Sequence, residues 1–232
     1  VFEDNEPQGI AGFICVRDPE RGISPEGLII GAREPAMGLR GIPETEILLE
    51  DLHIPADMVL VPPQGLRRGF AGLMTAYNAQ RVGAATVALG LAQGAYEQAL
   101  EYSQTRQQFG RPIAEFQGLQ WMLVDMSISI EAARLMIYKA AAGSDGEAGF
   151  PDVTDAARAK IMAAEVAIKV TNDALQVFGA AGYSRNLPME RMVRDARMFT
   201  IGGGTAQILR TQVASRILGK RLPQTRDGYL KN

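Results

Sequence analysis

The sequence has little with which to build a metal site or a disulfide. Its 232 residues contain one cysteine, Cys15, and one histidine, His53. A single cysteine excludes an intrachain disulfide and favours a reducing compartment, so we expect a cytoplasmic protein. A single histidine argues against a site of several histidines, and against a Ser-His-Asp triad unless another chain contributes. We therefore expect no metal.

The chain also lacks a marked charge of one sign and a long apolar run. It carries 24 basic and 26 acidic side chains, a formal net charge of −2. Nucleic-acid-binding domains usually show a basic excess, so we expect no nucleic-acid partner. No apolar stretch approaches the roughly 18 residues of a membrane span, and the acidic start is unlike a signal peptide. Hydrophobic residues make up 47% of the chain, which is ordinary for a globular protein.

The first 62 residues have the pattern of short strands separated by turns. Apolar runs at 10–16 and 27–30 are bounded by turn residues, and a half-buried strand pattern at 46–55 stops at Pro55. So few strands would leave open edges and little core. We therefore expect 1–62 to be the C-terminal part of a β domain that begins upstream of Val1.

After Pro63 the pattern is helical almost to the end, which predicts a second domain at 63–232. We expect helices at about 66–104, 112–142 with Pro112 in the first turn, 152–178, 188–199 and 205–218. Long helices with short loops predict an antiparallel bundle, so the fold class is mainly α with a β segment. The predicted apolar stripe of the first helix is Val82, Ala85, Val87, Leu89, Leu91, Ala92, Ala95 and Ala99.

Several segments resemble the acyl-CoA dehydrogenases, in the same order and with the same spacing. They are MGLRGIPET at 37–45, HIPADMVL at 53–60, RVGAA at 81–85, TRQQFG at 105–110, FQGLQ at 116–120, QVFGAAGY at 176–183, MVRDAR at 192–197 and GGTAQI at 203–208. The resemblance implies that family's C-terminal helical bundle, preceded by the end of its middle β domain. The family's N-terminal helical domain is absent from this sequence.

The resemblance implies a flavoprotein that binds FAD and an acyl-CoA thioester. Family members are usually homotetramers, dimers of dimers with FAD at the dimer interface, and the same assembly is implied here. An arginine fork suits phosphate oxygens, and Arg106 would contact the FAD pyrophosphate of a neighbouring subunit. The implied cofactor-binding residues are Arg106, Gln108, Phe109, Gln176, Gly179, Ala180, Thr205 and Gln207. The implied substrate-binding residues are Tyr77, Asn78 and Arg81.

These positions also have plain structural interpretations. Arg106 fits an exposed arginine at a helix end, and Thr205 fits a helix N-cap. Gln176 fits a side chain paired with backbone at a helix end. Taken singly, the structural interpretations are simpler, but together and in family order the positions favour a flavin site.

The catalytic base of the family is missing. Acyl-CoA dehydrogenases use a glutamate to remove the α-proton of the thioester while a hydride passes from the β-carbon to the flavin. That glutamate stands directly before Gly-Thr, where this chain has Gly203, or directly before the arginine matching Arg81, where it has Gln80. An amide takes up no proton near pH 7, so neither position carries a base. Gln80 also fits a neutral helix residue, and Gly203 fits a turn glycine before a helix.

The backbone N–H of Gly203 survives the loss of the side chain, and in the family it helps to polarise the thioester carbonyl. We therefore expect the catalytic positions at Gln80 and Gly203. Two family branches fit a site without a base: desulfination of 3-sulfinopropionyl-CoA to propionyl-CoA and sulfite, and decarboxylating oxidation of a malonyl-type thioester. We favour the first. The segments that resemble it in detail are 40–45, 76–84, 169–176, 199–201 and 222–231.

Two other hypotheses stay open. A conventional dehydrogenase with its base elsewhere would need another carboxylate, such as Glu97, Glu101 or one upstream of Val1. The helix placement of Glu97 and Glu101 predicts that both face solvent. A non-catalytic flavin-binding member of the family would bind FAD and turn over no thioester.

Overall fold

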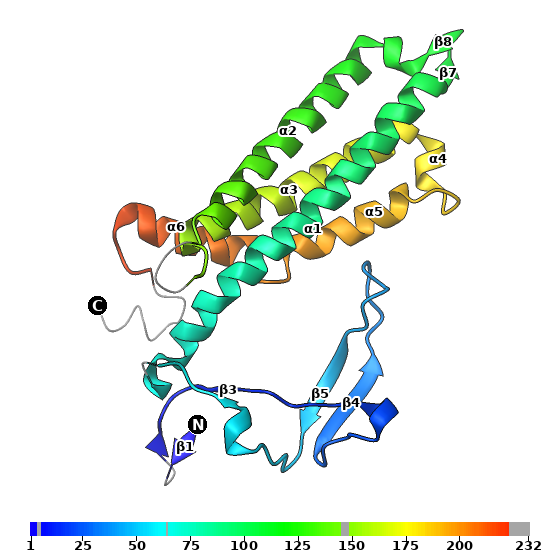
Figure 1. Ribbon diagram of the computed structural model, residues 1–232. Helices are drawn as coiled ribbons and strands as arrows, with labels where there is room; N and C mark the ends of the chain where they lie inside the picture. Colours follow the sequence, from blue (N-terminus) through cyan, green and yellow to red (C-terminus); the bar gives the residue numbers. More distant parts are fainter. Residues whose placement is uncertain (4–5, 64, 145–148, 223–232) are drawn as a thin grey trace. The chain divides into compact units, whose positions relative to one another are not determined.

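The computed structural model describes residues 1–3, 6–63, 65–144 and 149–222 (Figure 1). The chain divides into two compact units, Val1–Tyr77 and Asn78–Asn232. The division falls within the longest helix, α1 (Gly69–Thr105). Residues 145–148 of the loop expected at 143–151, and 223–231 of the C-terminal segment, lie outside the described residues. Among the described helices, none has the length and apolar character needed to cross a membrane.

The first unit contains short antiparallel strand pairs. β1 (Phe2–Glu3) pairs with β2 (Glu6–Pro7), β3 (Gly12–Phe13) with β6 (Val59–Leu60), and β4 (Leu28–Arg33) with β5 (Thr45–Leu49). Single 3₁₀ turns lie between the strands and before α1; they are η1 (Pro19–Arg21), η2 (Ala56–Met58) and η3 (Leu66–Arg68).

All three predicted strands differ in length from the prediction. The run at 27–30 is longer in the structure, since β4 continues to Arg33. The run at 10–16 is extended and paired as a strand only at β3. The run at 46–55 ends as a strand at Leu49, because Asp51 adopts a left-handed conformation (φ 51°) that interrupts the extended backbone. The β4–β5 hairpin exposes Ile29, Ile30 and Ile47, so this pair of strands has no buried face of its own.

The second unit is the predicted antiparallel helical bundle. Figure 1 shows α1, α2 (Gln117–Ala142) and α3 (Val153–Phe178) running lengthwise beside one another. Helix α3 packs against α2, α5 (Met189–Ala196) and α6 (Ala206–Leu218). The remaining elements of this unit are β7 (Gln107–Gln108), β8 (Arg111–Pro112), η4 (Ile113–Glu115), α4 (Ala180–Tyr183) and η5 (Arg197–Thr200).

Small side chains form much of the bundle core. The stripe predicted on α1 is confirmed at Val82, Leu89 and the four predicted alanines, all of which are buried. The prediction is wrong at Val87, which lies on the opposite side of the helix and is 60% exposed. Helix α3 presents a matching row of buried alanines, and small residues on facing helices let the backbones approach closely.

The predicted start of the second long helix is also wrong. Pro112 does not lie in the first turn of α2 but ends a two-stranded hairpin, β7–β8, and α2 begins at Gln117. The predicted start of α3 is confirmed, since the Asp152 carboxylate accepts hydrogen bonds from the backbone N–H groups of Thr154 and Asp155. The end of α3 at Phe178 is confirmed as well, and the short α4 follows it.

Candidate functional site

A cavity of about 450 Å³ is lined by residues of β7, α4 and the neighbouring helix ends. Figure 1 shows β7, β8 and α4 at one end of the bundle. Apolar side chains, including Tyr102, Phe116 and Phe178, form part of its wall. Six of the eight predicted cofactor-binding residues line this same cavity, although they come from segments some 70 positions apart. They are Arg106, Gln108, Phe109, Gln176, Gly179 and Ala180.

The β7–β8 hairpin holds an aromatic ring out at the mouth of this cavity. Phe109 and Gly110 form its two-residue turn with φ values of 53° and 78°, as a type I′ turn requires. Left-handed backbone is costly for a bulky residue, and the Phe109 side chain is 92% exposed. Its ring meets Phe116 edge-on at 6.0 Å, and the Arg111 guanidinium lies 4.2 Å from the centre of the Phe116 ring. A strained, exposed aromatic residue indicates a binding surface.

The opposite wall of the cavity is the end of α3. Phe178 stacks on Tyr102 of α1 with ring centres 4.1 Å apart, which ties the ends of the two helices together. Gly179 then turns the chain with φ 60° and ψ −135°, a conformation that favours glycine. The exposed Gln176 side chain makes no hydrogen bond within the described part of the chain, so its expected pairing with backbone is not seen.

A second cluster surrounds the glycine turn 202–204 that precedes α6. Arg81, which is 3% exposed, donates from Nε to the Gly203 carbonyl at 3.3 Å and from Nη1 to Asn78 Oδ1 at 2.9 Å. Lys160, which is 1% exposed, donates from Nζ to the Gly204 carbonyl at 2.7 Å. Two buried cations, from α1 and α3, therefore hold two successive carbonyls of one turn.

The surroundings of Lys160 penalise its charge. Burial, and secondarily the field of the Arg81 guanidinium, lower the pKa of Lys160 to about 8. Within the described residues, no carboxylate lies within ion-pairing distance of its Nζ. Sequence reasoning missed Lys160, because a lysine inside a helical pattern is usually on the solvent face.

The amide N–H groups of this turn point away from the two cations. In a trans peptide the C=O and the next N–H are opposed, so the anchored carbonyls of Gly203 and Gly204 direct the N–H groups of Gly204 and Thr205 outward. Gly203, Gly204 and Thr205 donate no backbone hydrogen bond within the part of the chain that the structure describes. Consecutive free N–H groups ahead of a helix attract an anionic oxygen.

Thr205 acts as the N-cap of α6, with its Oγ1 accepting from the Ile208 N–H at 3.2 Å, so the structural interpretation of this residue is confirmed. Gln207 lies in the first turn of α6 and is exposed. Gln80 is also exposed, on the same helix as the buried Asn78 and Arg81, and Tyr77 is half-buried.

The structure thus gathers the predicted residues into two separate groups. Tyr102, at the cavity, follows Arg81, at the glycine turn, by 21 residues of one continuous helix. At 1.5 Å per residue the two groups lie roughly 30 Å apart. The carboxylates considered as substitute bases are both exposed, and Glu97 accepts a hydrogen bond from Gln93 at 2.7 Å. Their predicted placement toward solvent is confirmed.

Residues 67–218 match the profile described as the acyl-CoA dehydrogenase C-terminal domain. The chain belongs to the acyl-CoA dehydrogenase family. It is 67% identical over 231 residues to the 3-sulfinopropanoyl-CoA desulfinase of Variovorax paradoxus, covering 100% of this chain and 57% of that protein. The chain therefore spans little more than half the length of that curated relative.

Two solved structures extend the comparison. Butyryl-CoA dehydrogenase from Megasphaera elsdenii is 36% identical, with a TM-score of 0.82 over 91% of this chain and 52% of that one. PigA, solved with FAD and proline, is 29% identical, with a TM-score of 0.76 over 84% of this chain and 49% of that one. Both confirm the mainly helical fold expected from the resemblance.

Proposed function

We propose that the protein desulfinates 3-sulfinopropanoyl-CoA (3-sulfinopropionyl-CoA) to propionyl-CoA and sulfite. The observation that carries this proposal is a thioester-activating turn without a base. Gly203 and Gln80 stand at the two positions where the family places its glutamate, and Glu97 and Glu101 face solvent. The 67% identity to a protein of that named activity supports it.

The overall reaction needs no external oxidant. The bond between the β-carbon and sulfur breaks, and one water supplies a proton to carbon and an oxygen to sulfur. The carbon gains the two electrons that the sulfur loses, as sulfinate becomes sulfite. No α-proton has to be removed by a side chain, which fits a site in which the usual carboxylate is replaced by Gly203 and Gln80.

In this proposal the chain's own contribution is positioning and charge. The N–H of Gly203 and the outward N–H groups of Gly204 and Thr205 polarise the thioester carbonyl. Arg81, Asn78 and Tyr77 hold the substrate side of the site, and Gln80 orients the sulfinate or the attacking water. Gly203 also leaves room for the substrate, since a Cβ there would meet nothing nearer than Lys160 Cε at 3.8 Å.

The open cavity near β7 and β8 fits FAD. Its wall combines stacking surfaces, at Tyr102 and Phe109, with the Arg106 guanidinium, whose planar fork suits a pyrophosphate. Gln108, Gln176, Gly179 and Ala180 supply the remaining contacts, and Thr205 and Gln207 contribute from the start of α6. Bound FAD supplies a ring system that can accept or return electrons.

Because the two groups of residues lie roughly 30 Å apart along α1, we propose that they serve FAD molecules in different subunits of a homotetramer, a dimer of dimers. We further propose that residues 1–62 are the end of a middle β domain and 63–232 the helical domain. The single cysteine supports a cytoplasmic location.

The test uses the protein at the full length its gene encodes, given 3-sulfinopropanoyl-CoA, with sulfite and the flavin spectrum followed together. We expect sulfite to appear without net bleaching. Bleaching by butyryl-CoA instead would identify a conventional dehydrogenase, and flavin binding without turnover of either thioester would identify a non-catalytic member.

A matched variant tests the role of the missing base. Gly203→Glu restores a carboxylate at the family position, and we expect it to gain bleaching with butyryl-CoA while losing sulfite release. The same substitution at Gly90, an exposed glycine of α1, should change neither activity.

A further inference from the structure

Lys160 differs from most other buried side chains because burying its charge costs free energy. It is one of the largest fully buried side chains, in the third turn of α3, and within the described residues its Nζ makes one hydrogen bond, to the Gly204 carbonyl. A neutral side chain would fill the same space without the desolvation penalty of an ammonium group. Placing this charge beside a second buried cation, Arg81, adds repulsion. A cost of this kind at a binding turn indicates a functional reason.

The two cations act on neighbouring peptide groups. Arg81 Nε holds the Gly203 carbonyl and Lys160 Nζ holds the Gly204 carbonyl, from different helices. Gly203 and Gly204 have φ values of 72° and 94°, a backbone conformation that only glycine adopts easily. A flexible turn without these two anchors would not keep that conformation. Loss of either anchor would free one peptide plane to rotate, and with it the N–H on its other side.

We propose that Lys160 is a positioning residue of this site: by anchoring the Gly204 carbonyl, it fixes the outward N–H of Thr205, next to the Gly204 N–H that Arg81 fixes, where negative charge develops on the thioester oxygen. Its charge also lies behind these N–H groups, on the side away from the ligand. A buried cation at that place strengthens the stabilisation of an enolate-like oxygen more than that of a neutral carbonyl. This inference rests on the proposed function only in that the ligand is a thioester.

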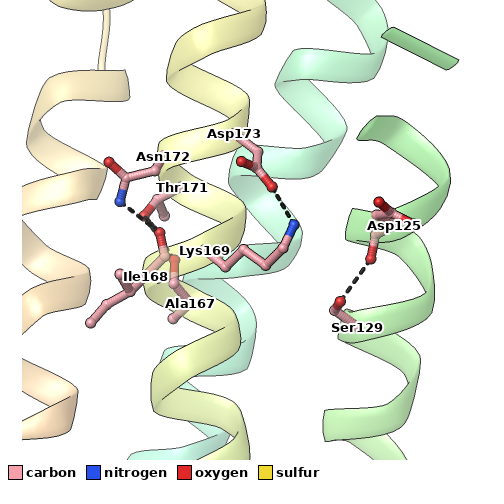
Figure 2. Close-up of polar contacts among 8 residues, drawn as sticks. All are labelled: Asp125, Ser129, Ala167, Ile168, Lys169, Thr171, Asn172 and Asp173. Atoms are coloured by element: carbon pink, nitrogen blue, oxygen red, sulfur yellow. Dashed lines mark hydrogen bonds and ion pairs between the residues drawn. The ribbon is translucent and has the colours of Figure 1, made fainter. Parts of the chain in front are cut away.

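The test compares Lys160→Met with Lys169→Met on the same helix. Figure 2 shows Lys169 paired on the helix surface with Asp173, at 2.6 Å. Its side chain is about half exposed and it takes no part in the glycine turn. Both substitutions remove the same amino group and leave a similar apolar side chain, so they differ in what the amino group contacts.

The first readout is the kinetics of sulfite release by the full-length holoenzyme. In Lys160→Met we expect kcat to fall by about 10- to 100-fold while KM changes by less than about threefold, because the interaction strengthens as charge develops. Lys169→Met should match the unsubstituted protein in both constants.

The second readout needs no turnover and so separates this inference from the proposed function. Acetoacetyl-CoA enolises by itself and presents a negatively charged oxygen, whereas propionyl-CoA presents a neutral carbonyl. We expect Lys160→Met to weaken acetoacetyl-CoA binding by about tenfold and propionyl-CoA binding by less than about twofold, as measured by titration calorimetry. Absence of sulfite release by the unsubstituted protein would refute the desulfinase proposal and leave this binding ratio as the test of Lys160.

The inference would be overturned if a folded Lys160→Met protein lost affinity equally for both thioesters, or lost none. A purely structural lysine would leave the ratio of the two affinities unchanged. Should that variant fail to fold, Lys160→Gln takes its place. Glutamine keeps a neutral donor without the charge, and we expect it to shift the ratio in the same direction by a smaller factor. A ratio equal to that of Lys169→Met in the glutamine variant would equally overturn the inference.

Discussion

The buried ammonium of Lys160 makes folding stability depend on pH. Burial and Arg81 lower its pKa from 10.5 to about 8 in the folded protein, while the unfolded chain keeps the ordinary value. The folded state therefore binds fewer protons than the unfolded state between about pH 8 and 10.5, and stability rises with pH across that window. The gain is at most about 3.5 kcal/mol, since one pKa unit corresponds to roughly 1.4 kcal/mol.

This expectation is checked by urea unfolding of the full-length protein and of Lys160→Met at pH 7.5 and 9.5. The difference in unfolding free energy between the two proteins should move in favour of the unsubstituted protein as the pH rises. Other groups titrate in this range too, but they are common to both proteins and cancel in the comparison. Lys169→Met should show no such movement, and a pH-independent difference for Lys160→Met would contradict the burial argument.

The backbone at Gly203 favours glycine, independently of the role proposed for its missing side chain. Its φ of 72° lies in the left-handed region, and a Cβ there would touch only Lys160 Cε at 3.8 Å. We therefore expect Gly203→Ala to destabilise the protein by about 1–2 kcal/mol through backbone strain alone, measured as a shift in the urea midpoint. Gly90→Ala is the control: this glycine has helical backbone and open space, so alanine should stabilise by up to about 1 kcal/mol.

At the scale of single elements, helical periodicity predicted most of the bundle, and its failures have local causes. The predicted apolar stripe on α1 is correct at the alanines. Val87 is apolar, but it lies off the buried stripe, so residue type alone does not place it. Pro112 fits a first helical turn as well as it fits the end of a strand. The hairpin turn at Phe109 and Gly110 places Pro112 at the end of a strand. In this turn phenylalanine adopts a left-handed backbone, which bulky residues disfavour.

The start of α3 depends on one carboxylate. Burial raises the pKa of Asp152, but the backbone N–H groups of Asp155 and Thr154 bond its charged form and bring the net pKa below the ordinary value. We expect Asp152→Ala to lower the unfolding free energy by about 1 kcal/mol at pH 7, and Asp152→Asn, which can also cap, to lower it by less. The charge-dependent part of the loss should be present above pH 4 and fade as the pH falls further, because both folded and unfolded carboxyls then become protonated.

At the scale of the whole molecule, the sequence did not predict how the proposed site residues group in space. Arg106, Gln108 and Phe109 meet Gln176 and Gly179 because α1 and α3 end side by side, which only the packing of the bundle decides. The sequence did not predict the burial of Lys160 for the same reason. Its burial depends on the 202–204 turn that packs against α3, not on its neighbours in sequence. Thr205 and Gln207 belong with the glycine turn, far from the cavity.

The spacing of roughly 30 Å between the cavity and the glycine turn makes a prediction about assembly. If each FAD is held by Arg106 of one subunit and by the α6 start of its neighbour, two different defects can compensate in a mixed oligomer. Arg106→Gln removes the proposed contact to the pyrophosphate, and Gln80→Ala removes the amide proposed to lie at the reacting sulfinate. Both side chains are exposed, so neither change should unfold the chain. Each variant alone should release little sulfite.

Co-expression of equal amounts of the two full-length variants, each with a different tag that reports its presence, gives subunits that pair at random. In a mixed dimer one site combines an intact Arg106 with an intact Gln80, while the other site has lost both. About one quarter of the sites in a random mixture are therefore restored, and sulfite release should return to about a quarter of the unsubstituted rate. A site built entirely within one subunit would give no recovery, because every subunit then carries its own defect. Mixing Arg106→Gln with Arg106→Lys of different tags controls for tagging and co-expression, and should restore no sites with both residues intact.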